Sequence, residues 1–364
     1  MYKPPKIREQ IKTALTRAEH TVRSYFYDAR HRKEAMDAVA YLERYGGTKL
    51  TPQIRKIADD YATETFGSKR FAPWLYAYTL IRGSFQEGWI PDNFYGRVVL
   101  PQVNSRLLII GDFKTFSNTV LQSDLFPDIA YFIDGILYGR DKSVIDLECV
   151  RDLIPSDQQY VFLKQDGSQS GLGVARVTRD ALSSEHFETM GNCVVQTAIE
   201  QHPFFDEIVP GPLTTLRVTT VRDNAGRIEA RAAIIKAGRA GFDVYETNHS
   251  IRAPIVDDDG TLGPLCYDED FRPHDAHPDT GFHFADRKVV GYAEMTSACV
   301  ALHKKVPQMA VIGWDVAFDR HDTVKFVEWN TGHADIILSE AANGPLFCDL
   351  GWEKLRTDRQ LLLD

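Results

Sequence analysis

The chain has 364 residues, of which 43% are hydrophobic and 26% are charged, the composition of an ordinary globular protein with room for two or three domains. Its formal net charge of −9 excludes broad binding of nucleic acid, which requires a basic surface. Nothing in the sequence resembles a signal peptide or a run of eighteen apolar residues, so we expect no membrane span and a cytoplasmic location. The five cysteines are widely spaced without a C-x-x-C pair, which indicates reduced thiols rather than a zinc ribbon or a disulfide framework.

The first hundred residues carry apolar side chains at helical spacing. The pattern predicts one helix over residues 7–26, a second from Ala35 through Leu42 to a stop at Gly46-Gly47, and a third that begins at Thr51-Pro52, a cap residue followed by proline. Aromatic residues then cluster from Phe71 to Phe94. They could line a substrate cleft, but burial between the helices and a neighbouring region is favoured, because aromatic side chains dominate protein cores. The sequence thus predicts a helical accessory region over residues 1–104.

Residues 105–158 are expected to form a second subdomain. Its first segment, RLLIIGDFKTFSNTVL, predicts a helix or a strand-to-helix passage that carries Lys114, and DIAYFIDGILYG predicts a buried strand with its turn. From Tyr160 an apolar strand ends at Lys164, a loop rich in glycine and serine follows, and a second strand begins at Val174. Such a loop lets backbone amides approach a phosphate, and Lys164 would add charge, although a plain flexible turn fits the same pattern.

Two strand cations stand out in the next part of the chain. After a short buried strand over residues 193–199, a hairpin turns at Asp223–Gly226 and carries Arg217 in its first strand and Lys236 at the end of its second. These cations need anionic partners, which could be substrate, phosphate or neighbouring acids. The long loop over residues 238–254 is typical of a lid or binding loop. Three histidines further on, at positions 274, 277 and 283, have the spacing of a zinc site, but the flanking prolines favour an ordinary loop, and residues 287–306 again predict a helix.

The stretch from Val311 to Asn330 predicts two short strands joined by a polar turn at residues 319–322. If the turn is symmetric, Asp315 lies opposite Phe326, and Gly313 lies opposite Glu328. Asp315, Glu328 and Asn330 then share one face, and the alternate residues from Ile312 to Phe318 form an apolar face. Oxygen ligands crowded in this way suit Mg²⁺, whereas the alternative is a solvated face with ordinary surface acids.

Taken in order, these segments resemble the ATP-grasp superfamily over residues 70–345, and they are most similar to its sugar-transfer-associated branch. The resemblance rests on DFKTF, FLKQDGSQSGLG, VVQTAIEQHP, TTLRVTTV, the HPDTG segment and the final pair GWDVAF and FVEWN. It implies an α+β fold in which two subdomains grip ATP, with the helical region in front. The expected boundaries are 1–104 for the helical region, 105–158 for the preceding subdomain, 159–345 for the nucleotide-binding and catalytic region, and 346–364 for a C-terminal tail.

The resemblance also implies roles for individual residues. Lys114 and Lys164 would contact ATP phosphates. Three groups complete the nucleotide and metal site: the flap residues Ser168, Gln169, Ser170, Gly171 and Gly173, the adenine and ribose contacts Gln196, Ala198 and Glu200, and the Mg²⁺ ligands Asp315, Glu328 and Asn330, with Mn²⁺ as an alternative ion. Arg217, Lys236 and Asn248 would face the γ-phosphate and an acyl phosphate. Trp329, between two of the metal ligands, is expected to point into the opposite layer.

The chemistry implied by the resemblance is ATP-dependent joining of a small-molecule carboxylate to an amine through an acyl phosphate, in natural-product or cell-surface polysaccharide biosynthesis. The alternatives are a kinase that uses the same nucleotide site and a non-catalytic ATP-binding protein of a polysaccharide-assembly system. The sequence names neither the acid nor the amine, and it leaves the oligomeric state open, with a homodimer as one alternative. Removal of the Asp315 or Glu328 carboxylate is expected to abolish turnover and to leave the fold intact.

Overall fold

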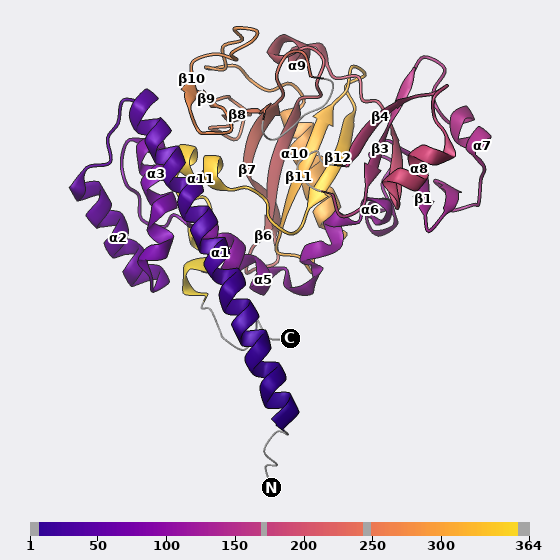
Figure 1. The fold of residues 1–364 in the computed structure, drawn as a ribbon. Helices are drawn as coiled ribbons and strands as arrows, with labels where there is room; N and C mark the ends of the chain where they lie inside the picture. The colour runs from indigo at the N-terminus through magenta and orange to yellow at the C-terminus, as the bar shows by residue number, and fades with distance from the viewer. Residues whose placement is uncertain (1–6, 169–172, 243–248, 356–364) are drawn as a thin grey trace.

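The computed structural model describes residues 7–168, 173–242 and 249–355, with side chains from residue 24 onward. Two antiparallel sheets lie side by side, and a helical region flanks the larger one (Figure 1). The fold is the expected α+β arrangement with helices at the N-terminal end. Its described α-helices are α1 Ile7–Tyr45, α2 Pro52–Phe66, α3 Ala72–Arg82, α4 Asp92–Phe94, α5 Leu100–Val103, α6 Lys114–Leu121, α7 Leu147–Asp152, α8 Ser184–Met190, α9 Pro203–Ile208, α10 Tyr292–His303 and α11 Ile337–Asn343.

The N-terminal helix α1 is a single helix of 39 residues, so the prediction of two helices over residues 7–26 and 35–42 was wrong. The buried face of α1 continues between the two predicted helices, because His31 is only 5% exposed and lies one turn before the buried Ala35. A histidine at an inward position interrupts the apolar pattern without interrupting the helix. The start of α2 is as predicted, since the Thr51 hydroxyl accepts a hydrogen bond from the backbone N–H of Ile54 at 3.2 Å.

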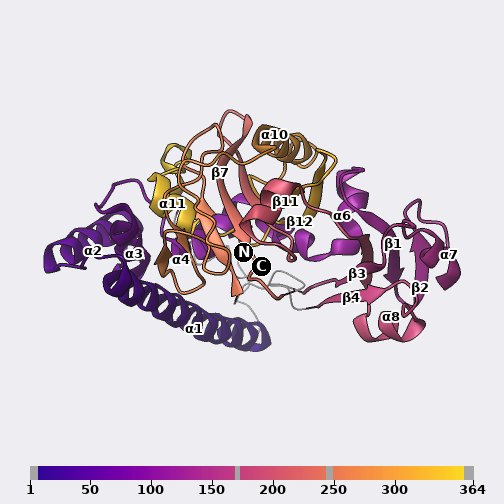
Figure 2. The same cartoon turned by 90° about the horizontal axis from the view of Figure 1, so that it is seen from above.

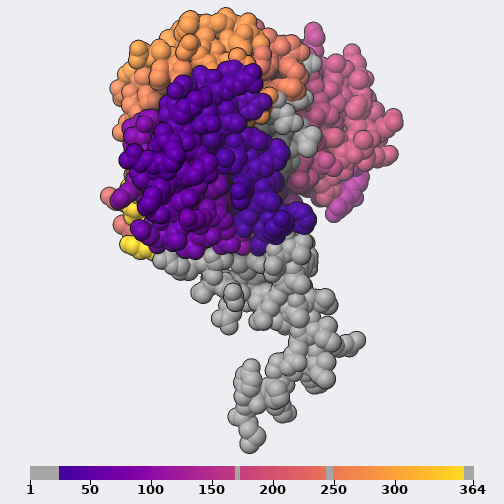
Figure 3. Space-filling view, turned by 60° about the vertical axis from the view of Figure 1, so that its left-hand side comes forward, coloured from indigo at the N-terminus to yellow at the C-terminus, as the bar shows by residue number. Residues whose placement is uncertain are grey.

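The aromatic cluster between Phe71 and Phe94 is core, so the packing interpretation is confirmed. Trp74, Tyr78 and Trp89 are at most 2% exposed, and Phe66, Phe71 and Phe94 pack against one another. The same core includes Val221, Ala232 and Ile234 from the larger sheet. The helical region is therefore packed against one face of that sheet, as a view from above also shows (Figure 2). On the outside, the described N-terminal helices form a continuous surface (Figure 3).

The smaller sheet has the strand order β2-β1-β5-β3-β4. Its β1 and β2 come from the segment before Tyr160, and the β3–β4 hairpin brackets the glycine-rich loop. Apolar side chains of one face, among them Val161, Leu163 and Val195, pack with α7 and α8 in a separate core. Its strands are β1 Asp128–Ile133, β2 Ile136–Gly139, β3 Tyr160–Gln165, β4 Val174–Thr178 and β5 Cys193–Thr197.

The larger sheet has the strand order β10-β9-β8-β7-β6-β11-β12. Helix α10 covers one face, where Met295, Cys299 and Leu302 pack on Ile312 and Trp314 of β11. The other face carries the charged residues described below. Its strands are β6 Thr215–Arg222, β7 Ile228–Ala237, β8 Ile251–Pro254, β9 Cys266–Tyr267, β10 Pro273–His274, β11 Val311–Phe318 and β12 Val324–Asn330. No helix among the described residues is long and apolar enough to cross a membrane.

The register of the β11–β12 hairpin differs from the prediction. Asp315 lies opposite Glu328 rather than Phe326, and Gly313 lies opposite Asn330 rather than Glu328. The turn is one residue longer than assumed, because Phe318 pairs with Val324 and Asp322 adopts a positive φ of 56°. A β-bulge between Asp315 and Val316 then adds a second one-residue shift. Two such shifts restore the original faces, so the predicted common face of the polar residues is retained.

Candidate active site

Three charged side chains lie opposite one another on neighbouring strands of the larger sheet. Asp315 on β11 pairs with Arg217 on β6 at one side and with Glu328 on β12 at the other. Directly opposite residues share a face, so the three side chains form one row. Asp315 and Arg217 are 3% and 8% exposed. The row therefore places a buried carboxylate between a cation and a second acid.

The Asp315 carboxylate accepts hydrogen bonds from two cations. Arg217 donates through both Nε and Nη2, the latter at 2.8 Å, and Lys236 Nζ donates at 2.9 Å. Burial alone would raise the pKa of Asp315, but the charges and hydrogen bonds of Arg217 and Lys236 together outweigh it and hold the pKa well below its usual range. The aspartate is consequently ionised at neutral pH.

Asn330 extends the same face by one step along β12. It lies opposite Gly313, two residues beyond Glu328, and its side-chain Nδ2 is buried without a hydrogen-bond partner among the described residues. A half turn about the Cβ–Cγ bond of Asn330 would exchange the nitrogen and oxygen of its amide and place the oxygen at this position. Two carboxylates and one unpartnered amide form an oxygen-rich donor set, which fits a hard cation such as Mg²⁺.

Trp329 points away from this face, as expected from the sequence. It is 2% exposed, stacks on Trp314 at a ring-centroid distance of 6.0 Å, and donates from Nε1 to the Ser117 hydroxyl at 2.9 Å. Ser117 belongs to α6, the helix that begins with Lys114. The Trp329 indole thus links β12 to α6 through a hydrogen bond, and its bulk lies on the side of β12 opposite to the polar face.

Two lysines approach the site from the side of the smaller sheet. Lys164 at the end of β3 donates to the Val327 carbonyl of β12 at 3.3 Å, and burial lowers the pKa of this lysine. Lys114 donates to the Ser168 carbonyl at 2.8 Å. The start of the glycine-rich loop is fixed to α6 by a further contact, in which Asp166 accepts bonds from the N–H and hydroxyl of Thr115 at 2.9 and 2.6 Å.

Only part of the predicted flap lies in the described residues. Gln169, Ser170 and Gly171 fall outside them, as does Asn248 of the predicted lid loop. Gly173 is described and has a φ of +83°, a conformation that favours glycine, and a Cβ at this position would lie 2.6 Å from the Ser168 Cβ. Ser168 and Gly173 therefore close the base of the loop tightly against each other.

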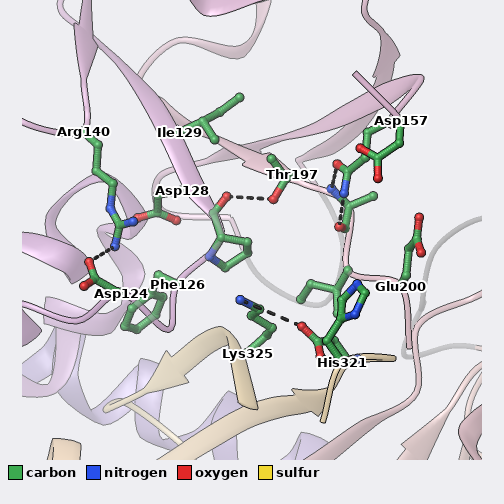
Figure 4. A pocket seen from close by; sticks show the side chains of 15 residues that line it. Asp124, Phe126, Asp128, Ile129, Arg140, Asp157, Thr197, Glu200, His321 and Lys325 are labelled. Carbon is green, nitrogen blue, oxygen red and sulfur yellow. Dashed lines mark hydrogen bonds and ion pairs between the residues drawn. The ribbon is translucent and has the colours of Figure 1, made fainter. Parts of the chain in front are cut away.

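The predicted base-binding residues lie around a cavity of about 310 Å³ between the smaller sheet and the β11–β12 turn (Figure 4). Ala198 and Glu200 line it, and Glu200 is paired with Arg320 at the rim. Gln196 does not line the cavity but lies beside it, where its amide donates to Asp128 at 2.8 Å. Burial raises the pKa of this aspartate, while Gln196 and Tyr131 act in the opposite direction through hydrogen bonds.

Sequence reasoning missed Asp128 and Gln158 at this cavity. The Gln158 carboxamide accepts from the Ala198 N–H and donates to the Ala198 carbonyl, both at 3.0 Å, so both backbone groups of Ala198 are engaged. Asp128 is an acid at the start of an otherwise apolar strand, and that position was the available sequence signal. Gln158 lies in a polar loop with no comparable signal.

The three histidines with zinc spacing do not converge. His274 pairs with Asp268, while His277 and His283 hydrogen-bond to the backbone carbonyls of Gly238 and Asp275. Among the described residues no group of three or more histidine, cysteine, aspartate or glutamate side chains could hold a metal ion. The prediction of a loop is wrong at His274, which lies in the short strand β10, while His277 and His283 lie outside the named strands and helices.

The family of the chain follows from comparison with known proteins. The model of the sugar-transfer associated ATP-grasp family matches residues 156–350, which is more than half of the chain. The protein belongs to this family, and its fold is the ATP-grasp fold with an added helical N-terminal region. None of the curated proteins compared with the chain matches it.

Several solved structures resemble the fold at low sequence identity. The biotin carboxylase domain of *Hydrogenobacter thermophilus* 2-oxoglutarate carboxylase, solved with MgADP, is 14% identical, with a TM-score of 0.42 over 69% of this chain and 47% of that one. The VanG D-Ala:D-Ser ligase of *Enterococcus faecalis* is 11% identical, with a TM-score of 0.40 over 69% and 63%. The ATP-grasp ligase PsnB in complex with a minimal precursor is 13% identical, with a TM-score of 0.39 over 68% and 62%. The chain thus spans about half of the carboxylase domain and less than two thirds of the two ligases.

Proposed function

We propose that the protein is an ATP-dependent ligase that joins a carboxylate to an amine. The observation that carries this proposal is the row of Arg217, Asp315 and Glu328, completed by Lys236 on the same carboxylate. Two acids and two cations, gathered on one face of a sheet, can hold a metal-bound phosphate and stabilise its transfer. Membership of the ATP-grasp family supports ATP as the phosphate donor.

In this proposal Asp315, Glu328 and Asn330 hold Mg²⁺, which when bound neutralises charge on the ATP phosphates. Lys114 and Lys164 bind phosphate oxygens from the opposite side, and Ala198, Glu200 and Gln196 surround the base and ribose. Arg217 and Lys236 hydrogen-bond to Asp315 in the structure. In this proposal the same two cations would turn toward the γ-phosphate when Asp315 holds a metal ion.

The reaction has two steps. A substrate carboxylate oxygen attacks the γ-phosphorus of ATP, the bond to ADP breaks, and Arg217 and Lys236 stabilise the charge on the transferred phosphoryl group. The amine nitrogen, after its ammonium form has lost one proton to solvent, then attacks the acyl carbon. A C–N bond forms, the C–O bond to phosphate breaks and inorganic phosphate leaves, and the nitrogen loses a second proton to give the amide. The chain's contribution is mainly positioning and electrostatic stabilisation.

The experiment is a screen for ADP release over amino acids, sugar acids and amines, followed by mass spectrometry of the products. A ligase requires both an acid and an amine and yields an amide, whereas a kinase requires a single acceptor and yields its phosphate ester. The Glu328→Gln variant should lose turnover, while Asp279→Asn, in a charge pair with Arg239, should retain it. ADP release that needs only one acceptor, or full activity of Glu328→Gln, would contradict the proposal.

A further inference from the structure

A second group of buried polar side chains lies where the helical region meets the end of β12. Asp92 of α4 is 2% exposed and lies 3.6 Å from His31 Nδ1 and 3.5 Å from His333 Nε2. Tyr95 follows in the π-helix Tyr95–Val99, and Tyr27 of α1 stacks near His31 at a ring-centroid distance of 4.2 Å. We call these five residues the interface cluster.

The interface cluster contains buried polar atoms that lack hydrogen bonds. The hydroxyls of Tyr27 and Tyr95 are buried without a hydrogen bond among the described residues, and the Oδ1 atom of Asp92 lies 3.5 Å from His333 Nε2 without a hydrogen bond to it. Tyr95 is 0% exposed, and its ring lies 5.5 Å from that of His333. A buried polar group without a partner costs stability, so several of them in one place indicate a ligand that supplies the missing bonds.

Asp92 has no lysine or arginine partner among the described residues, and its basic neighbours are the imidazoles of His333 and His31, at 3.5 and 3.6 Å. Trp74 donates from Nε1 to His31 Nδ1 at 3.2 Å, so this nitrogen carries a lone pair and His31 is neutral. Burial lowers the pKa of His31 to about 3 and raises that of Asp92 to about 7. Neither ion pair of Asp92 involves a lysine or arginine. The site is therefore suited to a ligand that brings a positive charge.

The cluster adjoins the row of charged residues on the larger sheet. The positive charge of Arg217 interacts electrostatically with the Tyr95 hydroxyl, so the two groups are near one another. Ala334, next to His333, packs over Gly313, where a Cβ would lie 2.7 Å from Ala334 and 3.4 Å from the Arg217 side chain. A ligand in the cluster would thus lie beside Arg217, the residue that we propose stabilises the transferred phosphoryl group.

The cluster is bordered on one side by partly exposed side chains. The side chains of His333, Glu34 and Asp335 are 39%, 49% and 30% exposed, and two of the three are acids. Their charges are partly balanced by Arg30, near Glu34, and by Arg252, 3.5 Å from Asp335. A Cβ at Gly96 would collide with the Tyr27 hydroxyl and the His333 ring, so glycine at this position keeps these groups close together.

We propose that the interface cluster binds the primary ammonium group of the amine substrate, through Asp92, Tyr95, Tyr27 and His333. The inference rests on the proposed ligase function and assigns a task to the helical region, which supplies all of these residues except His333. The acid substrate and ATP would be bound by the two sheets, and the amine would approach from the helical side.

The test measures binding directly, with methylammonium chloride as the probe and sodium chloride as the ionic control. In protein labelled at its histidine rings, the resonances of His31 and His333 should shift saturably with methylammonium and not with sodium. Asp92→Asn should weaken this binding about tenfold or more, because it removes a charged acceptor, and Tyr95→Phe should weaken it by about threefold. Tyr76→Phe is the matched control, since that hydroxyl bonds to Asp59 elsewhere in the helical region, and its affinity should match the wild type.

Absence of a saturable shift, or equal affinity in Asp92→Asn and the wild type, would overturn the proposal. Thermal unfolding of each variant checks that the fold is kept, and Tyr95→Phe should not lower stability because its hydroxyl has no partner to lose. The outcome is separate from that of the ADP-release screen. Saturable methylammonium binding supports the subsite even if no acid and amine pair releases ADP, and acid- and amine-dependent ADP release without such binding overturns the subsite alone.

Discussion

Replacement of Asp315 by asparagine should destabilise the protein strongly, in contrast to the expectation from sequence that the fold would tolerate loss of this carboxylate. The change leaves Arg217 and Lys236 beside a neutral amide in a site where Asp315 and Arg217 are 3% and 8% exposed. Removal of one partner from a buried ion pair costs about 3–5 kcal/mol, because the remaining charge stays desolvated. We expect a loss of that size in the free energy of unfolding, measured by urea denaturation at neutral pH.

The chain offers a matched control for burial. Asp279 and Arg239 form a two-point contact of similar geometry at 2.7 and 2.8 Å, but their side chains are 21% and 34% exposed. Asp279→Asn should cost about 1 kcal/mol or less. In the double variant Asp315→Asn/Arg217→Met, about 2 kcal/mol or more of the loss should be recovered, since one uncompensated charge is removed with its partner. A loss in Asp315→Asn no larger than that in Asp279→Asn would refute the reasoning.

Three further predictions concern stability. The pKa of Asp92 is raised from 3.8 to about 7, so the folded state keeps a proton that the unfolded state loses. The free energy of unfolding should therefore fall as the pH rises from 3.8 to about 7, and it should stay low at higher pH. Above pH 7 the Asp92→Asn variant should be more stable than the wild type by on the order of 4 kcal/mol. Urea denaturation at several pH values measures both effects. Ser117→Ala should cost about 1–3 kcal/mol by leaving the Trp329 Nε1–H unpaired, whereas unchanged stability would mean that water replaces the hydroxyl. Gly96→Ala should cost about 1–3 kcal/mol and weaken methylammonium binding, and a crystal structure with Tyr27 and His333 unmoved would contradict this.

The sequence predicted the strands that carry Lys164, Arg217 and Asp315 and the polar face of the last hairpin, but not the register of that hairpin. A symmetric turn was assumed, and neither the positive φ of Asp322 nor the bulge beside Asp315 has a strong signature in the sequence. Each feature shifts the pairing by one residue, and a single shift would have placed Glu328 on the apolar face with Trp314. The prediction of a shared face was confirmed because two one-residue shifts together displace the pairing by an even number of residues.

Polar residues at buried positions were the main limit of the sequence reasoning. His31 occupies an inward position of α1 between the two predicted helices, where the apolar periodicity that defined them is interrupted. Asp92 likewise lies in a short segment between aromatic residues and gives no periodic signal. Such residues are recognised only when the fold brings them together, since His333, which lies against both Asp92 and His31, comes from a distant part of the chain.

The hydrogen bond from Lys164 to the Val327 carbonyl has a consequence for ligand binding. It joins β3 of the smaller sheet to β12 of the larger one, so a phosphate that binds Lys164 must replace this carbonyl as the acceptor. The lost hydrogen bond offsets part of the binding free energy of the phosphate and removes a contact between the two sheets. Lys164→Met would remove the same contact and weaken the binding of phosphate groups.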